Sequence, residues 1–154
     1  MRIMKKMMMI ATLCVATIGL AVAAVWSHYD DERPITKSEL PAKAQEFLSA
    51  YYATSDVKYA AMDVDITSTE YEVVLENGTK IEFNEGGEWR SVDCPGGAVP
   101  AAIVPSEICD YVEANYPSCA IDELKRERRG WEVGLNNGLD LEFDATFRLM
   151  EIDD

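Results

Sequence analysis

The chain has 154 residues, with 28 Asp and Glu against 14 Lys and Arg, which gives a formal net charge of −14. This charge disfavours binding to nucleic acids and to anionic membrane surfaces, and it favours partners with a basic surface. Apolar residues make up 48% of the chain and recur throughout it, which excludes a disordered acidic protein. The length fits one ordinary domain.

The first residues are typical of a secretory signal peptide. Arg2, Lys5 and Lys6 precede an uncharged stretch, 7–25, that closes on a small-x-small pattern. We expect residues 1–24 to be removed, so that the mature protein is periplasmic or secreted and has no contact with the membrane. A retained anchor is the alternative, because the uncharged stretch is just long enough to span a bilayer.

Removal of the signal peptide takes three basic residues away. The mature chain then has 11 basic residues (14 minus 3) against 28 acidic ones, a net charge of about −17. It keeps Cys94, Cys109 and Cys119, an odd number, so at least one thiol is free or pairs outside the chain. The sequence leaves any disulfide pairing among these three cysteines open.

After a segment at 25–33 that we expect to be flexible, the chain contains one unit written twice. The first unit spans 34–93, a linker spans 94–97, and the second unit spans 98–154. The clearest match is between "EVVLENGTKIEF" from Glu72 to Phe83 and "EVGLNNGLDLEF" from Glu132 to Phe143. Each unit predicts a helix followed by four short antiparallel strands, which is an α+β fold.

The first unit begins with a predicted helix, whose apolar residues recur at helical spacing: Leu40, Ala44, Phe47, Leu48 and Tyr51. Strands are predicted near Val57–Asp63, Glu70–Glu76, Thr79–Asn84 and Glu88–Asp93, the middle two with strict alternation of apolar and charged residues.

The second unit repeats this order of elements. Its predicted helix carries the stripe Val104, Ile108, Tyr111, Val112 and Tyr116, and strands follow at Trp131–Asn136 and Leu139–Asp144. Asn77-Gly78 and Asn137-Gly138 favour two-residue type I′ turns.

These motifs resemble the exported PepSY-like proteins, which are grouped with the β-lactamase-inhibitor-protein-like (BLIP-like) fold. The resemblance rests on "YEV.L.NG..IEF…G.W..VD" and on the linker "CPGGAVPAAIVP", and it covers Ile35 to Asp153. It implies that the two units join into one eight-stranded antiparallel sheet, with helices on one face and a concave open face on the other. No catalytic motif comes with the family.

Alternation along the predicted strands assigns residues to the two faces of the sheet. Phe47, Leu48, Val73, Phe83, Val112, Val133 and Phe143 are expected to be buried. The open face is then expected to show Glu72 and Glu82 in the first unit and Glu132 and Glu142 in the second. Val92 is expected in the core, and Trp89 lies an odd number of residues before it, so alternation places Trp89 on the open face, with Leu149 as its counterpart in the second unit. An exposed Trp among carboxylates is typical of a partner-binding site. An alternative is that Trp89 folds against a neighbouring strand.

The sequence offers little for catalysis or cofactor binding. His28 is the only histidine, so neither a histidine-dependent nucleophile nor a structural zinc site is expected, and we predict no catalytic residue, cofactor or metal. Facing Glu pairs are what a solvated sheet face normally displays. The basic run 125–129 is expected to be a solvated charge cluster at a strand end.

The sequence therefore predicts an exported, non-enzymatic binding module. Its partner would be an envelope or secreted protein or peptide with a basic surface, held on the open face of the sheet, and the module could inhibit or regulate a hydrolase. The alternative is a small carbohydrate-active or other hydrolase that uses facing carboxylates.

Overall fold

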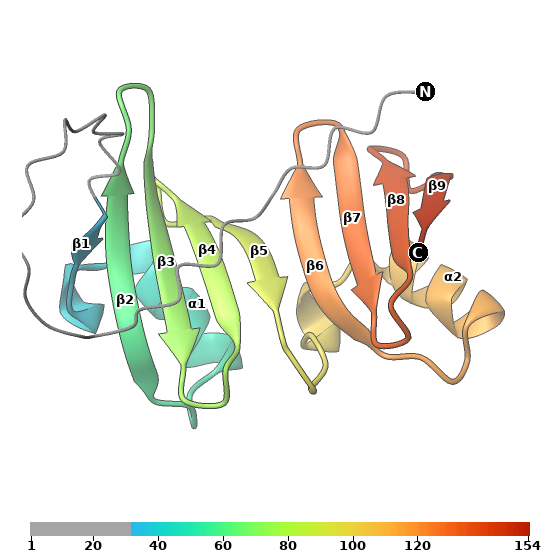
Figure 1. Cartoon of the computed structure of the whole chain (residues 1–154), viewed down its shortest axis with the longest axis horizontal. Coiled ribbons are helices and arrows are strands. Elements are labelled where there is room, and N and C mark those ends of the chain that lie inside the picture. Colours follow the sequence, from blue (N-terminus) through green and yellow to red (C-terminus); the bar gives the residue numbers. More distant parts are fainter. Residues whose placement is uncertain (1–31) are drawn as a thin grey trace, which may run out of the picture.

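The computed structural model describes residues 32–154, so the expected signal peptide and most of the segment at 25–33 lie outside the described residues. The described chain is an α+β fold with one nine-stranded antiparallel sheet, in which each strand pairs with the next along the chain. Two helices lie behind this sheet (Figure 1). Between residues 32 and 154 no helix is long and apolar enough to cross a membrane.

The elements follow the predicted order closely. The strands are β1 Arg33–Pro34, β2 Val57–Val64, β3 Thr69–Leu75, β4 Lys80–Asn84, β5 Trp89–Asp93, β6 Ile121–Glu127, β7 Gly130–Leu135, β8 Asp140–Asp144 and β9 Leu149–Asp153. Helix α1 (Ala42–Tyr51) precedes β2, and α2 (Ser106–Asn115) precedes β6. Short 3₁₀ turns at Lys37–Glu39 and Ala101–Ile103 lead into the helices.

The sequence predicted eight strands, and the sheet has nine. The additional strand is β1, which pairs with β2 through Arg33–Met62 and Pro34–Ala61. Two residues are too few to show an alternating pattern, so sequence periodicity could not reveal this strand. Arg33, the last residue of the segment at 25–33, thus lies in a strand.

The hairpin turns differ from the predicted type. At Asn77-Gly78, the amide of Gly78 donates to Leu75 O (2.9 Å) and the amide of Leu75 donates to Thr79 O (2.8 Å). Only Gly78 has a positive φ, of 87°, whereas a type I′ turn needs it at both central residues. The loop is therefore a three-residue turn with glycine in the left-handed position. Asn137-Gly138 forms the same loop between β7 and β8.

The β8–β9 loop uses the same geometry without a glycine. Phe147 has a φ of 61° where the corresponding residue of the β4–β5 loop is Gly87, with a φ of 77°. A left-handed conformation is costly for a residue that carries a Cβ atom. The ring of Phe147 stacks on that of Trp131, with centroids 6.2 Å apart, and this contact offsets part of the cost.

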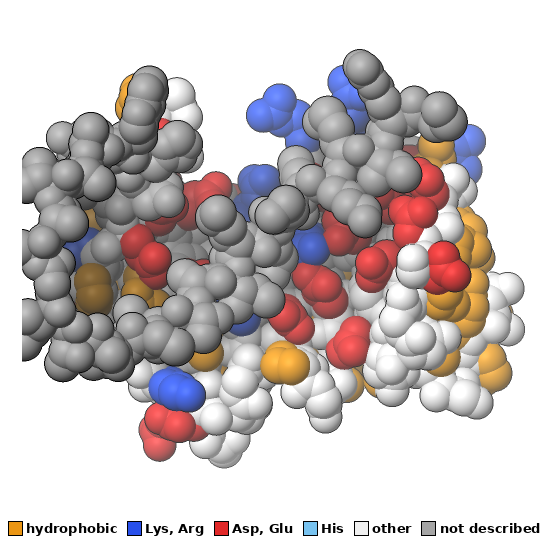
Figure 2. All heavy atoms as spheres, viewed as in Figure 1, with side chains coloured by type: hydrophobic (Ala, Val, Ile, Leu, Met, Phe, Trp, Pro, Cys, Tyr) orange, Lys and Arg blue, Asp and Glu red, His pale blue; other side chains and the backbone are white. Residues whose placement is uncertain are grey.

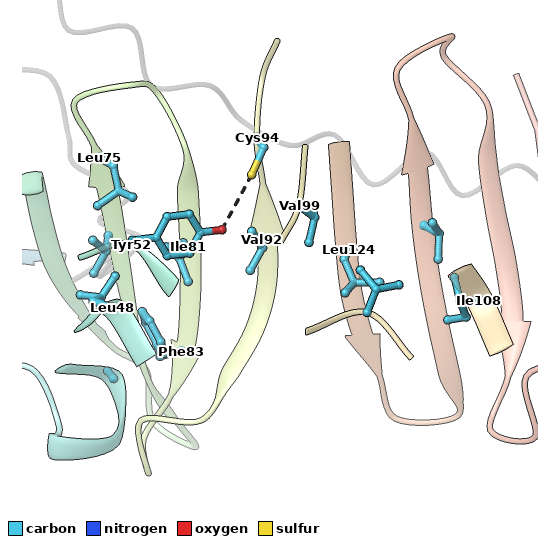
Figure 3. Close-up of a cluster of buried hydrophobic side chains, with 14 of the residues drawn as sticks. Leu48, Tyr52, Leu75, Ile81, Phe83, Val92, Cys94, Val99, Ile108 and Leu124 are labelled. Atoms are coloured by element: carbon cyan, nitrogen blue, oxygen red, sulfur yellow. Dashed lines mark hydrogen bonds between the residues drawn. The ribbon is translucent and has the colours of Figure 1, made fainter. Parts of the chain in front are cut away.

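The core lies between the sheet and the two helices (Figure 3). A row of directly paired apolar residues crosses it without a break: Val73, Ile81, Val92, Leu124, Val133 and Leu141, each fully buried. Of the residues predicted to be buried, Leu48, Val73, Phe83, Val112, Val133 and Phe143 are buried, whereas Phe47 is only half-buried. Burial of each large apolar side chain stabilises the fold by about 1.5–3 kcal/mol.

The three cysteines of the described chain are free thiols. Cys94 is buried at the end of β5, and its Sγ lies 3.9 Å from the hydroxyl of Tyr52 (Figure 3). Burial, together with Cys94, raises the pKa of Tyr52 above its usual range. Cys94 therefore acts as a small apolar residue at the junction between β5 and the following linker.

Truncation of Phe83 tests the burial that this packing predicts. Phe83 is fully buried, and its ring meets that of Phe47 edge to face at 5.7 Å. Phe83→Ala should lower the free energy of unfolding by about 3–5 kcal/mol, measured by urea denaturation, because it leaves a cavity. Ile66→Ala is the control, since Ile66 is 100% exposed and its loss should change stability by less than about 0.5 kcal/mol. Equal effects of the two substitutions would contradict the assignment of the sheet faces.

Candidate functional site

The face of the sheet opposite the helices carries two rows of charged residues. Directly paired residues lie on the same face, so the register from β3 to β9 defines a first row: Glu72, Glu82, Ser91, Lys125, Glu132, Glu142 and Glu151. The four glutamates predicted for the open face are therefore all in one row. Neighbouring strands are about 4.8 Å apart, which sets the spacing along this row.

A second row runs parallel to the first, two residues away from it on each strand. Its charged members are Lys80, Asp93, Glu123, Asp140 and Asp153, and Val74 and Gly134 complete it. Together the rows hold five glutamates in the first and four carboxylates in the second, nine in all, against Lys80 and Lys125. We call these two rows the acidic face.

Each lysine of the acidic face bridges two glutamates from neighbouring strands. Lys80 Nζ lies 2.8 Å from Glu72 Oε2 and 3.3 Å from Glu82 Oε1. Lys125 Nζ lies 2.8 Å from Glu123 Oε1 and 2.7 Å from Glu132 Oε1. Burial alone would lower the pKa of Lys125, but hydrogen bonds to Glu123 and Glu132 raise it above its usual range. The acidic face thus holds an ammonium group by paired carboxylates at two places.

The second half of the sheet has an aspartate where the first half has Lys80. The position equivalent to Lys80 in β4 is Asp140 in β8, because both residues begin the strand that follows the Asn-Gly turn. Carboxylates consequently predominate over β6–β9, where Figure 2 shows Asp and Glu side chains across the right of the view. This end of the acidic face has more negative charge than its own lysines compensate.

The pKa values of several carboxyl groups are raised at this end. Burial raises the pKa of Asp140, and the nearby charge of Glu132 adds to the effect. Burial and the charges of Glu151 and Glu132 raise the pKa of Glu142. Burial also raises the pKa of Glu123, despite its contact with Lys125. An approaching cation would relieve this repulsion.

Three carboxylates at the edge of this face come especially close together. One oxygen each from Glu142, Glu151 and Asp153 lie within 4.8 Å of one another, and all three residues are exposed. Glu142 is on β8 and the other two are on β9, so no spacing in the sequence indicates the group. A hollow of about 830 Å³ next to it is lined in part by Trp131, Glu132 and Met150.

Trp89 is not on the acidic face, and its placement there by parity is wrong. Glu82 pairs with Ser91 and Phe83 pairs with Trp89, so Arg90 is an extra residue in a β-bulge. The bulge reverses the alternation and turns Trp89 toward the helices, where its ring lies 6.0 Å from that of Phe47. The same irregularity in β9 places Leu149 beside Phe143 on the helix side.

On the helix side, Trp89 belongs to an aromatic cluster with Trp131. The two ring centroids are 6.1 Å apart. The guanidinium of Arg126 lies 4.9 Å from the ring of Trp89 and 5.6 Å from that of Trp131, which gives cation–π contacts to both. Because these residues come from β5, β6 and β7, the cluster ties the first half of the sheet to the second.

The basic run 125–129 is therefore not one solvated cluster. Lys125 points to the acidic face and Arg126 to the opposite side, since adjacent residues of a strand alternate. Arg128 and Arg129 are exposed beyond the end of β6. The pairing of Lys125 with Glu132 was not predicted, because the run was interpreted as a solvated charge cluster at a strand end.

The facing carboxylates Glu72 and Glu82 share one lysine, because Lys80 Nζ contacts both. Glu82 also accepts a hydrogen bond from Ser91 Oγ at 2.9 Å. The geometry is that of a charge-paired surface that can hold cationic groups.

Comparison with known proteins gives a family and several solved structures. Residues 68–151 match the model of the PepSY-like family, described as "Putative beta-lactamase-inhibitor-like, PepSY-like". No match was found among curated proteins. A structure from Bacteroides thetaiotaomicron, described as a "putative calcium-regulated periplasmic protein", is 39% identical, with a TM-score of 0.79 over 81% of this chain and 98% of that one.

Two structures from Bacteroides vulgatus are also similar. One, described as a "putative periplasmic protein", is 37% identical with a TM-score of 0.79, over 82% of this chain and 99% of that one. The other, a "putative periplasmic protein of unknown function", is 31% identical with a TM-score of 0.76, over 80% and 99%. None of these descriptions names an enzymatic activity.

The raised pKa of Asp140 predicts a pH-dependent effect on stability. A carboxyl group with a raised pKa in the fold stabilises the protein only below its unfolded pKa, and this contribution is lost as the pH rises through the folded pKa. Asp140→Asn should therefore raise the Tm at pH 7.5, and the difference from wild type should vanish near pH 3, below the ordinary pKa of 3.8.

Asp144 provides a control of opposite sign for this experiment. Hydrogen bonds from Thr146 and Arg148 lower the pKa of Asp144. Its stabilising contribution is present at neutral pH and is lost as the pH falls through the folded pKa. Asp144→Asn should lower the Tm at pH 7.5. A fall in Tm with Asp140→Asn at that pH would show that Asp140 is not under electrostatic repulsion.

Proposed function

Because this chain belongs to the PepSY-like family and carries an acidic sheet face, we propose that it is a non-catalytic periplasmic module that binds a basic segment of an envelope protein or peptide. The binding surface is the acidic face, with Glu72, Glu82, Glu132 and Glu142 in its central row. A hydrolase is one class of partner that the beta-lactamase-inhibitor-like description suggests.

The observation that carries this proposal is the manner in which the protein holds its own lysines. Lys80 and Lys125 are each seated between two carboxylates at 2.7–3.3 Å. The same face offers further carboxylates over β8 and β9, which form no ion pair with a lysine among residues 32–154. Lysine or arginine side chains of a partner would find the same coordination there, with charge-assisted hydrogen bonds.

Long-range electrostatics support the same class of partner. The mature chain has an excess of acidic residues, and nine carboxylates are gathered on one face. Such a surface raises the association rate of basic partners and repels acidic ones. Trp89 is on the helix side, so any role for it in binding would require a different surface from the one proposed.

Binding of a hexalysine peptide to the mature protein tests this proposal. The double variant Glu142→Gln with Glu151→Gln should lower the association rate constant about fivefold or more at low salt, because it removes two steering charges. Raising the salt from about 20 to 200 mM should produce a similar loss in the wild-type protein, since screening shortens the range of the field. Stopped-flow fluorescence of a labelled peptide measures both effects.

The matched control removes two charges from the helices instead. Glu46 and Glu113 are exposed on α1 and α2, on the other side of the sheet. Glu46→Gln with Glu113→Gln changes the net charge equally and should alter the rate by less than twofold. Equal losses from the two double variants would show that only net charge matters and would refute a specific binding face.

Calcium binding is a second candidate function for one part of this face. Glu142, Glu151 and Asp153 place carboxylate oxygens within 4.8 Å of one another, and oxygen ligands of this kind suit Ca²⁺. A relative that is 39% identical is described as calcium-regulated. In this function, Ca²⁺ would occupy the edge of the acidic face and compete with a basic partner.

Calorimetric titration with CaCl₂ tests this second function. Glu151→Gln should weaken binding at least about tenfold, because removal of one charged ligand lowers the affinity of a carboxylate site. Glu46→Gln is the control and should leave the titration unchanged. An absence of calcium-dependent heat in the wild-type protein would exclude the site while leaving the proposal for a basic partner intact.

A further inference from the structure

Strands β5 and β9 are each the last strand of their unit and have the same register with the preceding strand, but they differ in what covers their far edge. Each pairs with the preceding strand through the same bulge, so Ser91, Val92 and Asp93 correspond to Glu151, Ile152 and Asp153. Val92 is 0% exposed, whereas Ile152 is 46% exposed. The same apolar position is therefore buried in one half of the sheet and open in the other.

The difference arises because β6 pairs with the outer side of β5. Its contacts are Ser91–Lys125, Val92–Leu124 and Asp93–Glu123. Over residues 32–154, β9 is the last strand in the sheet and pairs only with β8. The bulge in β5 does not prevent this addition, since the three residues that follow it carry the pairing. The corresponding three residues of β9 have the same geometry.

Strand β6 shows what an added strand needs at this position. Leu124 covers Val92 on the helix side, and its neighbour Lys125 points to the acidic face, where it reaches Glu123 and Glu132. Strand β6 thus places an apolar residue against β5 on the helix side and a lysine on the acidic face, where the ion pairs of that lysine are to β6 itself and to β7. At β9 the equivalent apolar position is Ile152, and the adjacent carboxylates are Glu142, Glu151 and Asp153.

A second copy of the chain does not fit this edge well. Antiparallel pairing of two β9 strands would place directly opposed residues on the same face. The acidic side chains of Glu151 and Asp153 from both copies would then lie together, beside Glu142. Like charges opposite one another destabilise a strand pair, which disfavours self-association and favours a basic strand.

We propose that β9 binds an extended peptide segment, in which basic and apolar residues alternate, as a tenth strand of the sheet. Its apolar side chains cover Ile152 on the helix side, and its Lys or Arg side chains pair with Glu142, Glu151 and Asp153 on the acidic face. Main-chain hydrogen bonds to the open edge supply affinity, and the alternation supplies specificity. This mode of binding rests on the proposed function and adds to it a location and a partner pattern.

A synthetic peptide with the order Lys-Val-Lys-Val-Lys-Val-Lys is the probe for this proposal, measured by fluorescence anisotropy against the mature protein in the presence of EDTA. A peptide of the same composition with the lysines grouped together is its control. The alternating peptide should bind at least tenfold more tightly, because only alternation separates basic and apolar residues onto the two faces. Equal affinities would overturn the proposal.

Backbone methylation tests the strand pairing itself. One peptide is N-methylated on the lysines and a second on the valines, so that each blocks the amide groups along one edge only. Since β9 uses one edge of the added strand, one of the two peptides should lose binding at least tenfold and the other should lose much less. Equal effects would overturn the strand addition.

Substitutions in β9 locate the contact on the protein. Ile152→Lys should weaken binding of the alternating peptide at least tenfold, and Ile152 is exposed enough for the fold to tolerate the change. Met150→Lys is the matched control, because Met150 is 66% exposed and is the bulged residue that pairs with nothing on β8. Equal losses would mean that added charge, not the edge, is responsible.

The outcomes separate this inference from the proposed function. If hexalysine binds and depends on the acidic face, but the alternating peptide has no advantage, the function stands and the tenth strand is wrong. If neither peptide binds, both proposals fail. If the alternating peptide binds with the expected methylation pattern, the edge of β9 is the docking position.

Discussion

The row of apolar side chains from Val73 to Leu141 is the constraint on which the rest of the structure depends. Its six members come from six strands, pair directly with one another and are fully buried. A shift of any strand by one residue would turn its apolar side chains to the open face. The row therefore fixes the register of both halves at once, and it continues through the junction of β5 and β6.

The charge pattern of the open face is a consequence of this register. Residues on either side of each buried position must point away from the helices, and in this chain most of them are acidic. Stacking carboxylates across a sheet is unfavourable unless cations separate them. Lys80 and Lys125 do so over β3–β4 and β6–β7, whereas β8 and β9 have only carboxylates in the two rows.

A bulge in the last strand of each half then modifies the alternation. It turns Trp89 and Leu149 to the helix side. Trp89 therefore packs against the core and Arg126 and does not lie on the acidic face. The open face is left without large aromatic rings in its two rows and relies on charge. Recognition through such a face favours fast, salt-sensitive association, while the exposed edge of β9 supplies directional hydrogen bonds.

Much of this architecture was determined by the sequence alone. Alternation of apolar and charged residues gave the strands β3, β4, β7 and β8 and their faces, and placed Glu72, Glu82, Glu132 and Glu142 together. These features depend on local periodicity, which is a property of neighbouring residues. The tertiary structure decided the side of Trp89, the turn geometry at Gly78, the short strand β1 and the pairing of Lys125 with Glu132. Each of these depends on an irregularity or on a partner strand distant in sequence, and neither leaves a periodic signal in the chain.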